Sequence, residues 1–149
     1  MTNKNLQDQS IECPFCTGPG GELLFEDAVC RVVLVSGEEG AAFPGFCRVI
    51  GNRHEREMSD LSATEQRRLL DVVMATERAV RMVQCPDKMN LASLGNVVPH
   101  VHWHVIPRWT DDSHFPGPIW AAAQRIAKMR TPVDKIALHN ALETAMKTI

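Results

Sequence analysis

Three of the six histidines in this 149-residue chain lie within five residues of one another, at His100, His102 and His104. The residues between them are β-branched or aromatic, which favours an extended strand. Because side chains alternate between the faces of a strand, the three imidazoles are predicted to share one face, and Pro107 to end the strand. An imidazole nitrogen can attack phosphorus, donate to a phosphate oxygen or bind a metal ion. This row is the predicted centre of the chemistry, and a metal site built on alternating histidines remains an alternative.

A second group of reactive residues is Cys13-Pro14-Phe15-Cys16. Thioredoxin-like oxidoreductases place such a pair just after a buried strand, at a helix N-terminus that lowers the thiol pKa. Here a polar segment precedes the pair and a Gly- and Pro-rich segment follows it, so neither context is expected. Zinc ligation fits better, because two thiolates supply half of a tetrahedral site. The redox function stays open as an alternative.

The elements that must position these residues follow from hydrophobic periodicity and turn signals. Ser62 and Glu65 form a capping box that predicts the start of a long helix, which Cys85-Pro86 ends. Strands are predicted over residues 22–26, 29–35, 46–50, 88–94 and 100–106. Residues 119–130 and 134–148 are predicted to be helical. Trp120 is interpreted as a helix-packing residue and Glu39 as part of a solvated turn, and contact with a substrate is the alternative for both.

The stretch from His100 to Ile106 closely resembles the signature of the histidine triad (HIT) superfamily, in which three histidines alternate with apolar residues. Pro107-Arg108 often follows in that family. The resemblance extends upstream to Asn90, Gly95, Asn96 and His54. It spans roughly residues 12–109 of a single domain covering 1–149, and residues 110–149 form a C-terminal loop and helical extension.

This resemblance implies an α+β fold, with an antiparallel sheet, a long helix packed across it and C-terminal helices. It also implies a homodimer with joined sheets. The implied activity is that of a nucleotide hydrolase or transferase acting at the α-phosphate of dinucleoside polyphosphates or nucleoside phosphoramidates. His102 would form a nucleotidyl-histidine intermediate, His104 would donate to phosphate oxygens, and His100 would complete the catalytic row.

The resemblance implies binding residues as well. Substrate contacts are expected from Asn90, Gly95, Asn96 and Arg108. For Arg108, a solvated arginine at a strand end is an equally good interpretation. Related proteins combine a CxxC with a loop histidine and the first triad histidine in a zinc site. The implied ligands of a structural zinc ion are Cys13, Cys16, His54 and His100.

Three positions depart from the family pattern. Phe46 stands where a histidine often follows Pro-Gly, Asn96 replaces Gln, and Val97 replaces a Ser or Thr that contacts the leaving group. These changes put leaving-group assistance in doubt. They favour an alternative function, a nucleotide-binding partner protein with weak or vestigial catalysis.

The composition limits which other classes of protein this chain can belong to. Apolar residues make up 44% of the chain and charged residues 23%, as in ordinary globular proteins. A net charge of −2 gives no reason to expect bulk nucleic-acid binding. No apolar run approaches the roughly 20 residues of a membrane span, and the first ten residues lack a signal peptide's apolar region. Five cysteines without a disulfide-rich spacing indicate reduced thiols, and hence a cytoplasmic protein.

Overall fold

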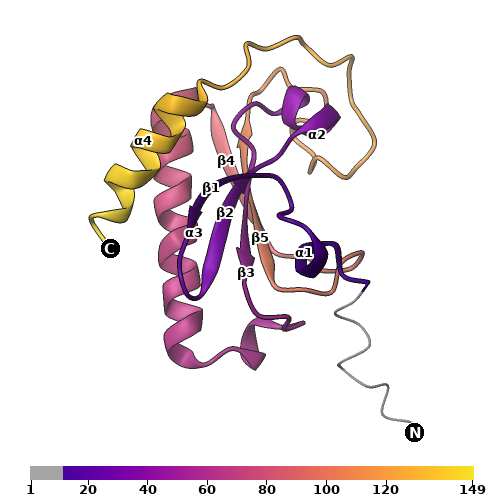
Figure 1. The fold of residues 1–149 in the computed structure, drawn as a ribbon. Coiled ribbons are helices and arrows are strands. Elements are labelled where there is room, and N and C mark those ends of the chain that lie inside the picture. The colour runs from indigo at the N-terminus through magenta and orange to yellow at the C-terminus, as the bar shows by residue number, and fades with distance from the viewer. Residues whose placement is uncertain (1–11) are drawn as a thin grey trace, which may run out of the picture.

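The computed structural model describes residues 12–149, which contain a five-stranded antiparallel sheet in the order β1-β2-β3-β5-β4. Figure 1 shows the sheet at the centre of the molecule, with helices on both faces. The strands are β1 (Glu22–Glu26), β2 (Cys30–Leu34), β3 (Cys47–Gly51), β4 (Lys88–Ala92) and β5 (His102–Arg108). The predicted 22–26 strand matches β1, and the predicted α+β class is confirmed.

One face of the sheet carries the long helix α3 (Ala63–Gln84), beside which α4 (Lys135–Met146) packs (Figure 1). As predicted, Ser62 caps α3: its hydroxyl accepts from the Glu65 N–H, and the Glu65 carboxylate accepts from the Ser62 N–H. The other face carries two short helices that the sequence did not predict, α1 (Pro14–Thr17) and α2 (Gly37–Ala42). A 3-10 turn, Met58–Asp60, precedes α3.

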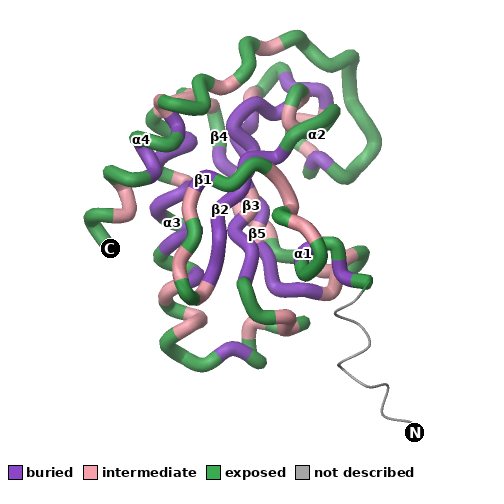
Figure 2. Tube along the Cα trace, in the orientation of Figure 1, coloured by how far each residue is buried: buried purple, intermediate pink, exposed green. Residues whose placement is uncertain are grey.

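The main core lies between the sheet and the pair α3–α4. Figure 2 shows β2 buried along its whole length and β3 and β5 buried along most of theirs. Val101 and Val105 belong to this core, and Trp103 packs against it. The predicted alternation is therefore confirmed, because the residues between the histidines face the helices while the histidines face the opposite layer.

The prediction that Pro107 ends the last strand was wrong. β5 continues to Arg108, with Pro107 opposite Met89 of β4. The pairing of β5 with β3 ends at Val105, so Pro107 lies where β5 has a neighbour on one side only. A missing N–H is tolerated there. The strand also begins later than predicted, and His100 lies just before it.

The helix predicted over residues 119–130 was also wrong. This segment runs as turns and extended chain, and its apolar side chains Ile126 and Met129 are 94% and 95% exposed. The N–H groups of Gln124 and Arg125 donate to the Ser113 carbonyl instead of to a helical ladder. The predicted helix over 134–148 is confirmed as α4.

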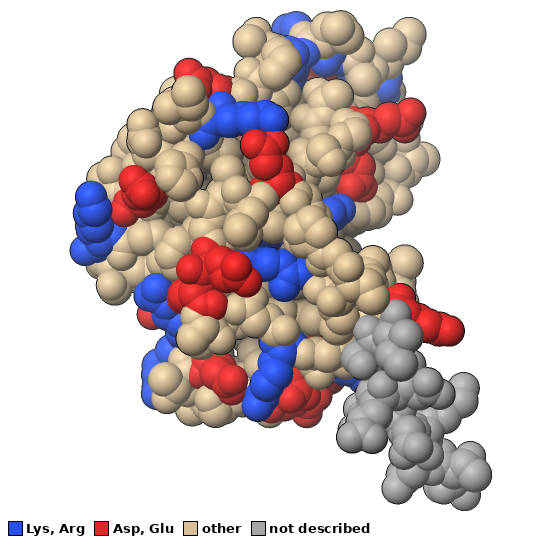
Figure 3. Space-filling view, viewed as in Figure 1, with Lys and Arg blue, Asp and Glu red and all other residues tan. Residues whose placement is uncertain are grey.

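No helix within residues 12–149 is both long enough and apolar enough to cross a membrane. On the face shown in Figure 3, acidic and basic side chains are mixed. The polar segment noted at the start of the sequence falls in residues 1–11, outside the described part of the chain.

Candidate active site and metal centre

The middle histidine of the row is held in one tautomer by the backbone. His102 Nδ1 lies 2.6 Å from the carbonyl oxygen of His100. A carbonyl can only accept, so Nδ1 carries the proton and Nε2 keeps its lone pair. Burial lowers the pKa of His102, and the Arg48 charge acts in the same direction against the opposing effect of this hydrogen bond. The result is a neutral imidazole whose Nε2 is available as a nucleophile.

His102 and His104 line one cavity of about 920 Å³, together with the Gly95–Val98 loop. Their ring centroids are 4.8 Å apart. Burial, reinforced by the nearby His102 and by the Arg48 charge, lowers the pKa of His104 to about 3. His104 is therefore neutral at pH 7 and can offer a phosphate group one N–H rather than a full positive charge.

The first histidine of the row faces a different set of atoms. His100 Nε2 donates to the carbonyl of Gly51 at 2.6 Å, which leaves the lone pair on Nδ1. That Nδ1 lies 3.4 Å from Cys13 Sγ and 3.6 Å from Cys16 Sγ. Both ring nitrogens of His100 thus have partners outside the cavity that His102 and His104 line.

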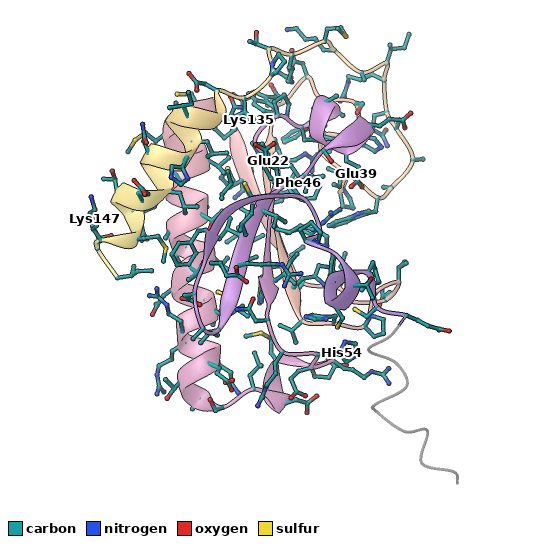
Figure 4. All side chains as sticks on the ribbon, in the orientation of Figure 1. Glu22, Glu39, Phe46, His54, Lys135 and Lys147 are labelled. Atoms are coloured by element: carbon teal, nitrogen blue, oxygen red, sulfur yellow. The ribbon has the colours of Figure 1, made fainter. Side chains whose placement is uncertain are left out.

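Cys13, Cys16, His54 and His100 bring one possible ligand atom each to within 4.8 Å of one another. His54 Nδ1 lies 3.2 Å from Cys16 Sγ, and Figure 4 shows His54 on the loop beyond β3, below α1. In a tetrahedral site with Zn–S near 2.3 Å and Zn–N near 2.0 Å, neighbouring ligand atoms are about 3.5 Å apart. The distances and the donor set therefore fit a four-coordinate zinc ion. Nothing in the sequence alone could show that these four atoms converge.

The thiol chemistry does not resemble that of a dithiol oxidoreductase. Cys13 occupies the N-cap position of the single-turn helix α1, so the helical context that the sequence did not predict is present. Burial and the neighbouring Cys13 raise the pKa of Cys16 to about 11, whereas redox-active CxxC thiols have lowered values. A bound cation would lower the pKa of Cys16 again, because metal ligation favours the thiolate.

Helix α1 links this cluster of possible metal ligands to the histidine row. Phe15, between the two cysteines, packs edge-on against His102 with ring centroids 4.8 Å apart. It also contacts the ring of His100 at 5.8 Å. Any ion that fixes Cys13 and Cys16 therefore also fixes the aromatic wall beside His102.

The predicted substrate residues fall into two groups. Gly95 and Asn96 lie in the loop that lines the cavity, close in sequence to the row. Asn90 and Arg108 lie outside the cavity lining. They bind each other instead: the Arg108 guanidinium donates to Asn90 Oδ1 at 2.7 Å. Arg108 is 1% exposed and also donates twice to the Asp112 carboxylate, at 2.7 and 3.0 Å. The alternative interpretation of Arg108 as a solvated arginine was wrong.

The departures from the family pattern have clear positions. Phe46 is fully buried, with its ring 5.7 Å from that of His104. Val97 is 93% exposed at the cavity rim, where it offers no hydrogen-bond donor from its side chain. Both positions lack a polar group that could meet a leaving group.

Three further residues line the cavity, and of these only Arg48 was not considered from the sequence. Arg48 and Glu39 line it and pair with each other at 3.1 Å. Trp120 is not the predicted helix-packing residue: its ring lies 4.9 Å from that of His104, and 45% of the residue is exposed. For Arg48, a signal existed, because an arginine in an otherwise apolar strand is unusual. For Trp120, the alternative to helix packing agrees with its place in the cavity lining.

An open antiparallel sheet that presents a row of histidines to a cavity, backed by one long helix, places the protein among the histidine triad proteins. The sequence model of the HIT domain matches residues 23–111, more than half of the chain. The chain belongs to this family. Two curated relatives named AP-4-A phosphorylase, from Mycobacterium tuberculosis strains CDC 1551 / Oshkosh and ATCC 25618 / H37Rv, are 30% identical over 78 residues. That region is 48% of this chain and 40% of each relative, so the chain matches about two fifths of their length.

Solved structures show the same fold. A histidine triad protein from Marinobacter aquaeolei VT8 is 27% identical with a TM-score of 0.66, covering 87% of this chain and 91% of that one. A histidine triad protein from Bradyrhizobium japonicum is 25% identical with a TM-score of 0.62, covering 86% and 91%. A protein from Mycobacterium smegmatis, described as a Zn-bound histidine triad family protein, is 20% identical with a TM-score of 0.61, covering 94% and 99%.

Proposed function

We propose that the protein is a nucleotide hydrolase or transferase that acts at the α-phosphate through a nucleotidyl-histidine intermediate on His102. The observation that carries this proposal is the 2.6 Å hydrogen bond from His102 Nδ1 to the His100 carbonyl. It leaves the Nε2 lone pair of a neutral imidazole beside a cavity large enough for a nucleotide. Membership of the HIT family and relatives named AP-4-A phosphorylase support a nucleotide-processing role.

The reaction divides one displacement into two. His102 Nε2 bonds to the α-phosphorus while the bond to the leaving group breaks, and the leaving group keeps the electron pair and takes a proton. Water then bonds to phosphorus, the P–N bond breaks and its electron pair returns to Nε2. The products are the protonated leaving group and a nucleoside 5′-monophosphate, and the proton that water loses replaces the one that the leaving group took from solvent. Phosphate as the acceptor in place of water would give a nucleoside diphosphate, which is the transferase outcome.

The surrounding groups stabilise charge without a catalytic metal. Phosphoryl transfer depends mainly on positioning and on charge stabilisation around the equatorial oxygens. We assign N–H donation to His104, to the Asn96 amide and to the backbone of the Gly95–Val98 loop. Asn90 and Arg108 would then act indirectly, by holding β4 and β5 against the loop that follows β5.

A substrate panel tests the proposed function. Diadenosine tetraphosphate and an adenosine phosphoramidate are incubated with the protein, and release of AMP or ADP is followed by chromatography. We expect release of AMP from at least one of the two classes, with the ratio between them defining the preferred leaving group. Replacing water by added phosphate as acceptor, and measuring ADP, separates hydrolysis from transfer. No product from either class would contradict an enzymatic role.

The buried Phe46 and the exposed Val97 favour a second candidate, the nucleotide-binding partner protein. Both residues stand where a polar side chain would assist the leaving group, so they reduce catalysis more than binding. Tight nucleotide binding without turnover in the panel would support this candidate instead.

We also propose that the ion held by Cys13, Cys16, His54 and His100 is zinc in a structural role. Four protein ligands leave no open position for water or substrate. The ion would fix α1, and with it Phe15, against the catalytic row. The Gly51 carbonyl, which accepts from His100 Nε2, would orient the His100 ring as an outer partner. The Zn-bound histidine triad protein with the same fold supports the choice of metal.

Cys13→Ser should remove the metal. The purified wild-type protein is expected to contain about one zinc ion per chain, and the variant well below half of that, because a neutral hydroxyl is a poor substitute for a thiolate. Cys85→Ser, at a cysteine outside the cluster, is the matched control and should keep the metal. Elemental analysis after dialysis measures both. Equal metal content in the two variants would exclude Cys13 as a ligand.

The homodimer and the cytoplasmic location remain proposals. The resemblance to histidine triad proteins supports the first, and light scattering in solution measures it directly. Free thiols at all five cysteines support the second.

A further inference from the structure

Arg48 contributes a cationic side chain to the cavity beside His102. Among the described residues that line it, Arg48 is the only lysine or arginine. Arg48 lies on β3, in direct register with His104 of β5, so both side chains project into the same layer. The strands themselves therefore place a guanidinium beside the catalytic row.

The Arg48 guanidinium is only partly satisfied by the protein. Nη1 donates to the Gly20 carbonyl at 3.2 Å, and Nη2 to the Glu39 carboxylate at 3.1 Å. The buried Nε has no hydrogen-bond partner among residues 12–149, and neither has the buried Nδ1 of His104 in the same cavity. Two neighbouring residues of one cavity thus each carry a buried nitrogen that no described group satisfies.

Stability does not explain this arrangement. An unpartnered buried polar nitrogen costs about 1–3 kcal/mol, and an apolar residue in the middle of β3 would avoid this cost. Burial lowers the pKa of Arg48 and the Glu39 carboxylate raises it, but an arginine stays charged in either case. A charge kept at such a cost beside a reactive imidazole is typical of a binding group for an anion.

We propose that Arg48 binds the non-bridging oxygens of the substrate's α-phosphoryl group, and that Glu39 is its partner in the free protein. This inference rests on the proposed function and adds a residue to it. A planar guanidinium can donate to two phosphate oxygens at once, which a neutral imidazole cannot do. Arg48 would thereby supply the positive charge that His104 lacks at pH 7.

The ion pair with Glu39 makes phosphate binding an exchange of partners. Glu39 lies in α2, on the cavity side of the sheet (Figure 4), and its carboxylate is exposed enough for water to solvate it when Arg48 turns to a phosphate. The same carboxylate repels additional phosphate groups. Removing its charge should therefore strengthen the binding of anionic ligands.

Equilibrium binding of the four ribonucleoside 5′-monophosphates and their matching uncharged nucleosides tests the role of Arg48. The wild type should bind one monophosphate more tightly than its nucleoside. Arg48→Gln should weaken monophosphate binding by about 10–100-fold, the range for hydrogen bonds between charged groups, and leave nucleoside binding unchanged. Arg48→Lys should lose less monophosphate affinity than Arg48→Gln does. Glu39→Gln should bind the monophosphate more tightly than the wild type does. Arg67→Gln, on the exposed side of α3, is the matched control for charge.

The outcomes separate this inference from the proposed function. Binding of a monophosphate that Arg48→Gln leaves unchanged would overturn the role of Arg48 alone. An equal loss for monophosphate and nucleoside would assign Arg48 a structural role and overturn it as well. A wild type that binds neither ligand would overturn the proposed nucleotide function together with this inference. Retained nucleoside binding shows that Arg48→Gln is folded, and Arg48→Lys provides the comparison if it is not.

Discussion

His102→Ala should reduce turnover of the nucleotide substrate by at least about 10³-fold while leaving nucleotide affinity within a few-fold of the wild type. The substitution removes the only atom proposed to bond to phosphorus, whereas the groups proposed to hold the phosphate remain. Initial rates of AMP release and equilibrium binding measure the two effects. Rapid acid-free quenching of the wild type with radiolabelled substrate should also trap label on the protein, and His102→Ala should trap none.

Two controls make this result specific. His114→Ala changes a histidine whose Nδ1 pairs with Ser113 outside the cavity lining, and its rate should stay close to that of the wild type. His102→Gly should recover part of the activity when imidazole is added, because the cavity can then hold a free nucleophile. A rate for His102→Ala within tenfold of the wild type would assign the chemistry to another group.

The sequence predicted the parts of this protein that depend on local pattern. The alternation from His100 to Val105 was enough to place imidazoles on one face and core residues on the other. The Ser62 capping box predicted the start of α3 to the residue. Each of these predictions uses residues within one element, where spacing alone decides the face or the boundary.

The predictions that were wrong concern segments whose structure depends on contacts with distant parts of the chain. The 119–130 segment has helix-forming residues, but its backbone is held by the Ser113 carbonyl and its apolar side chains find no surface to cover. A helix of this length is marginal without such packing. The place of Trp120 against His104 follows from this non-helical course, and so the interpretation of Trp120 as a helix-packing residue was wrong.

The pair Arg48–Glu39 shows the same limit at the candidate site. Arg48 meets His104 because β3 pairs with β5 in one particular register, and Glu39 meets Arg48 because the short helix α2 folds over that strand. The proposed zinc ligands converge for the same reason, across more than eighty residues between Cys13 and His100. The resemblance to the histidine triad family implied the four metal ligands, which spacing alone did not predict. No such resemblance pointed to Arg48.

Arg108→Met should destabilise the protein by about 3–5 kcal/mol, the cost of leaving a buried charge without its partner. Arg108 and Asp112 are 1% and 2% exposed, so water cannot replace the lost bidentate pair. The same guanidinium donates to the Gly117 carbonyl at 2.8 Å and so holds the chain that leads to Trp120. Chemical denaturation measures the loss. Arg81→Met, at an exposed pair with Glu77, is the matched control and should change stability by less than about 1 kcal/mol.

The pH dependence of stability provides a second measurement of this pair. Burial alone would raise the pKa of Asp112, but hydrogen bonds from Arg108 and from backbone N–H groups outweigh it and lower the value to about 2. A lowered carboxyl pKa stabilises the folded state above the unfolded value near 4, and this contribution is lost as pH falls from about 4 to about 2. In Arg108→Met the pKa of Asp112 should rise toward its unfolded value, so the loss of stability between about pH 4 and about pH 2 should be smaller than in the wild type. Identical acid unfolding profiles for the two proteins would show that the Arg108 charge does not stabilise the Asp112 carboxylate.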